Sequence, residues 1–413
     1  MADCFAGAGY DTASFGKLHL TPYMADEARG YPECLNRWLA GVPDDWGQPY
    51  EELRPLENHW HGPYYGFRHV EMVLGHGEWP CFAGHYAQWL QREHPKDFRQ
   101  VNLETAPRIA RDLSDLYPSP LPFALHNSCW LADRFCDYLT HDRPMDRPFF
   151  AFVGFPDPHH PFTPCREIAV EFEGVAVLDP CDQEGNGQAG SPVLRINQQR
   201  TDGISRETLQ MAARYTAAMV YQIDLAVGRI LYVLEAAGLA EDTIIAFTSD
   251  HGEYLGDHGC LRKGFGASDS LLHVPFLLRA PDSDLPARVA TPMSNCDVLP
   301  TLAALAGVTP PAWQHGEDMT GIVRKGRPHH AFAFSANGDP EATNHTVYDD
   351  RYRLTWYPRD DFVELFDHQE DPGECRNIAA EPAQHGRVQE LKRRIADQLA
   401  ASYTPILGRM SAW

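Results

Sequence analysis

The sequence lacks the features that mark several large classes of protein. No apolar run approaches the roughly 18 residues needed to span a bilayer, and the longest run, around 148–155, has the length of a strand. Basic residues are too few to balance the acidic ones, since 35 Lys and Arg against 57 Asp and Glu give a formal net charge of −22. This acidity argues against a nucleic-acid partner and against an anionic membrane surface. The acidity does not exclude an anionic substrate, because a pocket can concentrate a few cationic side chains.

Cysteines and the common catalytic motifs are also scarce. Ten cysteines in 413 residues are too dilute for a disulfide scaffold, and none are spaced as CxxC. We therefore expect mostly reduced core cysteines, with the cytoplasm as the default compartment because the chain shows no signal peptide. The sequence has no GxSxG elbow, no P-loop, no HExxH and no strand–GxGxxG–helix unit. Internal repeats are absent as well.

The residues that are present predict a large folded core. Hydrophobic residues make up 43% of the chain and aromatic residues 11%, which excludes a disordered or fibrous protein. The length favours two or three domains. Residues 21–125 are rich in Pro, Gly, Trp, Tyr and His without sustained periodicity, which indicates long loops over one face of a sheet.

Periodic segments after residue 125 predict an α/β fold. A buried strand is expected at 147–155 and a β-branched strand at 243–250. Between them lies a helix that Gly238 would end, with its apolar stripe at Met219, Ile223, Val227, Ile230, Leu231 and Leu234. The alternation of strands and helices continues through 273–281, 297–308 and 330–336. This order favours a mostly parallel central sheet flanked by helices.

The last ninety or so residues have a different pattern. Tyr352, Leu354 and Trp356 alternate strictly along a strand, and an amphipathic helix over 388–399 follows. We therefore expect an α/β catalytic domain over residues 1–322, incomplete at its N-terminus, and a smaller C-terminal α+β domain over 323–413.

Asp250 and His251 open the most specific polar motif of the chain. Asp250 ends the strand at 243–250, and His251 and Gly252 follow it. Open α/β sheets bind their ligands at the carboxyl ends of strands, and a carboxylate and an imidazole are both ligands of divalent cations. The motif predicts a metal site, with a plain polar turn as the alternative. A second Asp-His-Gly at 257–259 is expected to shape the loop.

Three further cationic side chains are candidates for binding an anion. Lys17 and His19 are an i, i+2 pair, so on an extended segment both side chains point to the same side. Such a pair could hold one anion, although most pairs of this kind are simply solvated. Lys263 lies just after the Asp-His-Gly loop and carries little weight alone.

Proline-rich and helix-opening segments supply the remaining candidates. In FVGFPDPHHPFTPC, four prolines fix the backbone around His159 and His160. A histidine at a strand end suits a general acid, and a stiff loop with solvated histidines is the alternative. His126 and Asn127 open a helix, where they are as readily an N-cap and its neighbour as substrate contacts.

These segments, in this order, resemble the sulfatase family of the alkaline phosphatase-like superfamily. AGYDTASFGKLHL is similar to the family signature Gly-Tyr-x-Thr-x-x-x-Gly-Lys-x-His, and FPDPHHPF to its Pro-His-x-Pro segment. Residues 223–259 match the family's helix, strand and metal loop. Residues 297–308 and 364–379 match two later landmarks of the family. The five matches are collinear and cover nearly the whole chain. The resemblance implies the alkaline phosphatase-like fold.

The resemblance also implies roles for the candidate residues. Asp250 and His251 match two ligands of the family's single divalent metal, which is usually Ca²⁺ and is Mn²⁺ in some relatives. During reaction at sulfur, a sulfate ester carries charge on its oxygens and on its leaving group. A metal and two lysines neutralise this charge.

Four other residues match the family's catalytic groups. Lys17 and His19 match the pair that orients the nucleophile and holds the sulfate. His159 and Lys263 match the residues that bind the ester oxygens and help to protonate the departing alcohol.

The family's nucleophile has no counterpart in this chain. It is a formylglycine made from Cys or Ser in Cys/Ser-x-Pro-x-Arg, upstream of the Gly-Lys-x-His signature, and two Asp ligands of the metal come earlier still. Only sixteen residues precede Lys17, none of the ten cysteines begins Cys-x-Pro, and the similar run 105–108 lies after the signature. We expect a fragment of a longer, active protein that starts at an internal Met, because the downstream set of site residues is complete. The alternative is a genuinely short protein that cannot turn over substrate.

The sequence therefore favours hydrolysis of a small-molecule or carbohydrate sulfate ester. A near alternative is hydrolysis of a phosphonate monoester or phosphodiester, since relatives share the same metal, lysines and histidine. An inactive, anion-binding sulfatase-like protein is the alternative from a different class. We expect no nucleic-acid and no membrane partner, and a homo-oligomer is left open.

Overall fold

The protein divides into two compact units, each built from discontinuous segments. The computed structural model describes residues 1–18, 20, 61–73, 84–101, 107, 109–181, 191–264, 266–281, 285–321, 332–338 and 342–402. Unit 1 comprises Met1–Leu178 and Ile204–Asp242, and unit 2 comprises Asp179–Gly203 and Thr243–Trp413. The domain boundary between residues 322 and 323 stays a prediction.

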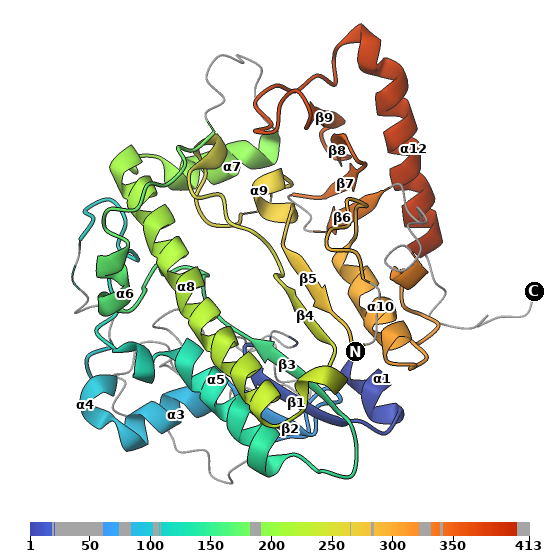
Figure 1. Ribbon diagram of the computed structural model, residues 1–413. Helices are drawn as coiled ribbons and strands as arrows, with labels where there is room; N and C mark the ends of the chain where they lie inside the picture. Colours follow the sequence, from blue (N-terminus) through green and yellow to red (C-terminus); the bar gives the residue numbers. More distant parts are fainter. Residues whose placement is uncertain are drawn as a thin grey trace, which may run out of the picture. The chain divides into compact units, whose positions relative to one another are not determined.

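Unit 1 is organised around a parallel three-stranded sheet (Figure 1). Its strands, in the spatial order β2-β1-β3, are β2 (His69–Met72), β1 (Asp11–Gly16) and β3 (Phe149–Gly154). Gly16 lies opposite both Met72 and Gly154, so the three strands end at the same edge of the sheet. All of β1 is buried, as expected for a central parallel strand covered on both faces.

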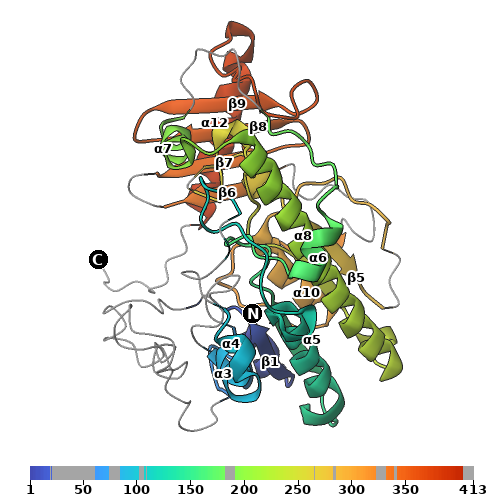
Figure 2. The same ribbon diagram turned by 90° about the vertical axis from the view of Figure 1, so that its left-hand side faces the viewer.

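Helices surround this sheet, and the long helix α8 (Arg206–Ala236) packs on α5 (Asn127–Asp137) and on α6 (Arg166–Glu171), as Figures 1 and 2 show. Ser205 caps the start of α8 by accepting a hydrogen bond from the Thr208 amide at 3.2 Å. Gly238, with φ of 69°, follows its last turn. The other elements are α1 (Ala2–Gly7), α3 (Gly84–Glu93), α4 (Pro95–Phe98), η4 (Phe123–Leu125), η5 (Tyr138–Asp142) and η6 (Ala240–Asp242).

Helix α8 is long and apolar enough to cross a membrane by length and composition alone. This corrects the expectation that no apolar segment reaches that length. A helix that packs in a protein core passes the same test; α8 packs on α5 and α6, and 39% of its most apolar 18-residue stretch is buried. The predicted apolar stripe is buried at Met219, Ile223, Ile230 and Leu234, whereas Leu231 is 39% exposed.

Unit 2 contains two antiparallel sheets. Strands β4 (Ile245–Thr248) and β5 (Phe276–Arg279) form a pair. The second sheet has the order β6-β7-β8-β9, with bounds Ala333–Asn337, Asn344–Tyr348, Tyr352–Tyr357 and Phe362–Asp367. Helix α12 (His385–Ser402) packs on β7 and β8 through Val388, Leu391 and Ile395 (Figure 1). The remaining elements are α7 (Pro192–Thr201), η7 (Asp257–Gly259), α9 (Asp269–Leu272), η8 (Asn295–Asp297), α10 (Val298–Leu305) and η9 (Pro382–Gln384).

The structure confirms the α/β class, the parallel sheet and the C-terminal antiparallel sheet with its closing helix. Two expected strands are present, but their place in the parallel sheet was wrong. Strand β5 pairs antiparallel with β4, and β6, which overlaps the expected strand at 330–336, belongs to the C-terminal antiparallel sheet. An apolar run predicts a buried strand but does not encode its direction. Between β4 and β5 the described chain forms only short helices, whereas a parallel connection needs a crossover that passes over the sheet.

Candidate active site and metal loop

Lys17 leaves the carboxyl end of β1, at the edge where the parallel strands of unit 1 end. Its amide donates a hydrogen bond to the Gly154 carbonyl at 2.8 Å, and its side chain is half-buried. Gly16 makes this close approach possible: its φ is 99°, and a Cβ there would lie 2.1 Å from the Gly154 oxygen. His19 lies outside the described residues, so the shared direction of Lys17 and His19 stays a prediction.

His159 follows the neighbouring strand β3 and is held in the proline-rich turn. Its amide donates to the Pro156 carbonyl at 3.2 Å, and its ring centroid lies 4.1 Å from that of His160. Nδ1 is 2.6 Å from the His160 carbonyl oxygen, which assigns the N–H to Nδ1 and leaves Nε2 to exchange a proton. Because β1 and β3 are in register at their ends, Lys17 and His159 follow the same edge of the sheet.

His126 and Asn127 lie in a buried polar cluster at the start of α5. They are 2% and 1% exposed, and His126 Nδ1 caps the helix by accepting from the Ser128 amide. Asp157, itself 4% exposed, receives hydrogen bonds at Oδ2 from Ser128 Oγ at 3.2 Å and from Gln222 Nε2 at 3.3 Å. Burial lowers the pKa of His126, so its ring is neutral near pH 7. This geometry supports the capping alternative, and contact of either side chain with substrate stays a prediction.

Asp250, His251 and Lys263 come together in unit 2, directly after β4. The Asp250 carboxylate is 77% exposed, and its Oδ1 accepts from the His251 amide at 3.0 Å. His251 Nδ1 lies 2.7 Å from the Gly252 carbonyl oxygen, so the N–H is assigned to Nδ1. His251 Nε2 is 3.7 Å from Asp250 Oδ2 and 3.3 Å from Lys263 Nζ. An anionic group, an imidazole nitrogen and an ammonium therefore share one exposed loop.

The backbone of this loop is fixed by its packing on α9. The Gly252 amide donates to the Leu271 carbonyl at 2.8 Å, and a Cβ on Gly252 would lie 2.0 Å from the Ser270 carbonyl oxygen. Asp257 accepts from the Cys181 amide at 2.9 Å and from Ser270 Oγ at 2.6 Å. The second Asp-His-Gly therefore shapes the loop, as the sequence predicts.

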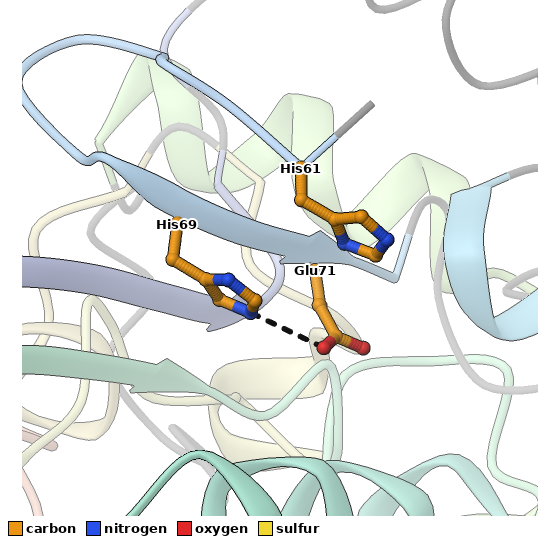
Figure 3. A group of neighbouring side chains, drawn as sticks. All are labelled: His61, His69 and Glu71. Carbon is orange, nitrogen blue, oxygen red and sulfur yellow. Dashed lines mark hydrogen bonds and ion pairs between the residues drawn. The ribbon is translucent and has the colours of Figure 1, made fainter. Parts of the chain in front are cut away.

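Two other groups of side chains among the described residues could hold a metal ion, and sequence reasoning missed both. In the first, His61, His69 and Glu71 gather beside β2 (Figure 3), with His69 Nε2 3.2 Å from Glu71 Oε1. Arg134 already binds both oxygens of Glu71, with Nε and Nη2 each at 2.8 Å. A guanidinium in this fork geometry neutralises the carboxylate and competes with a cation.

The second group, Asp269, His368 and Glu374, has the same feature in unit 2. Arg353 binds both oxygens of Glu374, one through Nε and one through Nη2 at 2.7 Å. Both groups are better explained as ion-pair networks that stabilise the fold. The i, i+2 spacing of His69 and Glu71 on a strand was the one sequence signal that could have indicated the first group.

The Glu71 ion pair predicts a loss of stability in acid. Burial raises the pKa of Glu71, but hydrogen bonds from His69 and Arg134 and the charge of Arg134 outweigh it and lower the pKa from 4.5 to about 2. A carboxylate with a lowered folded-state pKa stabilises the fold above pH 4.5, and this stability is lost as the pH falls towards 2. We expect a loss from this group on the order of 3 kcal/mol, measured by urea denaturation from pH 6 downwards.

Glu71→Gln should remove this part of the pH dependence. Glu93, whose side chain is 51% exposed and pairs with Arg92, provides the matched control, and Glu93→Gln should leave the pH profile unchanged. An unaltered profile in Glu71→Gln would contradict the assignment.

The family-model comparison identifies the class of protein. The Sulfatase family model matches residues 1–308. A model for the C-terminal part of N-sulphoglucosamine sulphohydrolase matches residues 256–401. The chain belongs to the sulfatase family.

Individual relatives support the same assignment. The chain is 23% identical to an arylsulfatase of Clostridium perfringens over 76% of this chain and 65% of the relative. It is 27% identical to a choline-sulfatase of Rhizobium meliloti over 91% of this chain and 66% of the relative. The chain thus spans less than two thirds of the length of these curated relatives.

The solved structures include a phosphonate monoester hydrolase from Silicibacter pomeroyi. It superposes with a TM-score of 0.75 at 20% identity, covering 99% of this chain and 82% of that one. At this identity the likeness shows that the two chains share a fold.

Proposed function

We propose that the protein is a metal-dependent hydrolase of sulfate esters and that Asp250, His251 and Lys263 form part of its active site. The observation that carries the proposal is the position of His251 Nε2 between the Asp250 carboxylate and the Lys263 ammonium, directly after β4. Membership of the sulfatase family supports it. The substrate is a small-molecule or carbohydrate sulfate ester, in line with relatives named as choline-sulfatase and endo-4-O-sulfatase.

Asp250 and His251 fit a divalent cation of the kind that sulfatases require. The Asp250 carboxylate is exposed, and the Nδ1–H of His251 is directed to the Gly252 carbonyl, a bond that commonly orients metal-binding imidazoles through Nε2. Two ligands are a part of the roughly six to eight that Ca²⁺ takes, so other donors complete the coordination. We propose Ca²⁺, with Mn²⁺ as the alternative. When bound, the metal would neutralise charge on the ester oxygens.

The other candidate residues would act on the sulfate group and on the leaving alcohol. We assign Lys17, His19 and Lys263 to binding the sulfate oxygens, since ammonium and imidazolium groups stabilise the charge that develops there. His126 and Asn127, at the start of α5, would contact the substrate. Lys17 and His159 belong to unit 1, and Lys263 belongs to unit 2. That these three residues act on one sulfate ester is part of the proposal. No residue of this chain is assigned as the nucleophile.

Two ester substrates discriminate among the candidate functions. The intact protein, supplied with Ca²⁺ or Mn²⁺, is assayed with p-nitrophenyl sulfate and with p-nitrophenyl phenylphosphonate. A higher kcat/KM for the sulfate supports the proposal. A higher value for the phosphonate overturns it in favour of the phosphonate monoester or phosphodiester hydrolase. Binding of sulfate without turnover of either ester would indicate the anion-binding protein.

His159 is expected to donate a proton to the leaving alcohol. His159→Asn should lower kcat/KM by roughly 100-fold or more for alkyl sulfates, whose alcohols leave poorly, and much less for p-nitrophenyl sulfate. His160→Asn is the matched control, because it removes the neighbouring ring but keeps the backbone carbonyl that lies 2.6 Å from His159 Nδ1. Equal losses on both substrates would reduce His159 to a binding role.

A further inference from the structure

Cys181 and Cys375 face each other in unit 2 although 194 positions separate them in the sequence. The Cys181 thiol is among the groups that raise the pKa of Cys375, and Cys375 Sγ donates to the Gly373 carbonyl at 3.6 Å. Both sulfurs lie against Gly373: a Cβ built on that residue would be 2.3 Å from Cys181 Sγ and 3.4 Å from Cys375 Sγ. Any larger residue at position 373 would push into the Cys181 sulfur, so the glycine keeps the space in which the thiols meet.

Both cysteines are held at the backbone. The Cys181 amide donates to Asp257 Oδ1 at 2.9 Å, and its carbonyl accepts from the His258 amide at 2.9 Å. The Cys375 amide donates to Asp371 Oδ1 at 3.0 Å. Formation of a bond between the sulfurs therefore needs side-chain rotation about two backbones that are already held in place.

We propose that Cys181 and Cys375 are a site of reversible disulfide formation that cross-links unit 2. The oxidant is a small-molecule disulfide, RSSR. One protein thiolate attacks RSSR, forms a mixed disulfide and releases RS⁻, which takes up a proton. The second protein thiolate then attacks the protein sulfur of that mixed disulfide and releases the second RS⁻. In total, two protein thiols are oxidised and one RSSR is reduced to two RSH.

The surroundings of Cys375 favour the oxidised form once it is made. Burial, the Cys181 thiol and the charges of Asp371 and Asp257 raise the pKa of Cys375 to about 11. A disulfide is easily reduced when its reduced form is stabilised as a thiolate. The raised pKa of Cys375 disfavours the thiolate, so it disfavours reduction of a disulfide at this site. The half-buried position of both cysteines also leaves them accessible to a small oxidant.

The cross-link would stabilise the folded segment that carries the candidate metal loop. It would close the chain between residues 181 and 375, a segment that contains Asp250, His251 and Lys263. Asp257, which binds the Cys181 amide, also accepts from Ser270 Oγ at 2.6 Å in α9, on which the loop packs. A disulfide across a long loop removes conformational freedom chiefly from the unfolded chain.

The test compares the full chain before and after equilibration with oxidised glutathione. We expect the thiol count under denaturing conditions to fall by two, and a protease digest to give Cys181 and Cys375 in one linked peptide pair, lighter by two hydrogens. The midpoint of thermal unfolding should rise by roughly 5 °C or more, and a reducing agent should reverse the rise.

Three variants make the result specific. Cys181→Ser and Cys375→Ser should each abolish both the linked peptide and the thermal shift. Cys296→Ser removes an exposed thiol elsewhere in unit 2 and should leave both unchanged. The proposal is overturned if the two cysteines stay reduced or carry glutathione at equilibrium, or if either pairs with a different cysteine. The readouts involve no catalysis, so they are independent of the proposed sulfatase activity.

Discussion

Asp250→Ala is expected to abolish divalent-metal binding and sulfate-ester hydrolysis together in the intact protein. The exposed carboxylate of Asp250 is the one anionic ligand that we assign to the metal, and its loss leaves the His251 imidazole beside an ammonium group. We expect metal affinity to fall by about 100-fold or more, since loss of even an indirect partner of a metal ligand commonly costs about 10–100-fold. Titration calorimetry with Ca²⁺ and Mn²⁺, and kcat/KM for p-nitrophenyl sulfate, measure the two losses.

An acidic residue far from Asp250 in the sequence provides the control for this variant. Asp350 lies in the exposed turn between β7 and β8, so Asp350→Ala removes an equal charge at a distance from the loop in sequence. It should leave metal affinity and turnover unchanged. If Asp250→Ala keeps both metal and activity, the assignment of the metal loop is wrong.

Arg353→Met is expected to destabilise the protein by about 3–5 kcal/mol. Arg353 is 2% exposed, binds both oxygens of Glu374, and donates to Thr355 Oγ1 at 2.6 Å. Burial raises the pKa of Glu374, but the charge of Arg353 and hydrogen bonds from His368 and Arg353 lower it to about 2. Removal of the arginine therefore leaves a carboxylate buried without its main partner. The free energy of unfolding in urea measures the effect.

Two comparisons separate this ion pair from ordinary packing. The double variant Arg353→Met with Glu374→Leu should recover most of the lost stability, because two apolar side chains can replace a buried pair. Arg376→Ala breaks an exposed pair with Glu381 and should change stability by less than about 0.5 kcal/mol. A small effect of Arg353→Met, similar to that of Arg376→Ala, would contradict this account of the C-terminal sheet.

The sequence predicts the elements whose causes are local. Helix α8 and its stop at Gly238 follow from the periodicity and from a glycine that adopts positive φ. The alternation at Tyr352, Leu354 and Trp356 likewise predicts β8. The order of the Gly-Lys-x-His, Pro-His-x-Pro and Asp-His-Gly segments carries the family assignment that the family model confirms.

Long-range pairing could not be predicted from the sequence. Arg353 occupies the face of β8 that alternation marks as polar, yet it is buried because Glu374, distant in sequence, neutralises it. The direction of β5 depends on the path of the chain between β4 and β5, and an apolar run does not predict that path. Cys181 and Cys375 lack any CxxC spacing, so only the folded chain reveals that both sulfurs lie against Gly373.

The position of a bound metal tests the active-site proposal most directly. Crystals of the intact protein grown with Mn²⁺ and sulfate would locate the metal by its anomalous X-ray scattering. We expect Mn²⁺ bound by Asp250 and by His251 Nε2, with a sulfate between the metal and the Lys263 ammonium and with Lys17 and His159 at its other oxygens. Mn²⁺ held by His61, His69 and Glu71, or a sulfate that Lys17 and Lys263 do not share, would contradict the proposal.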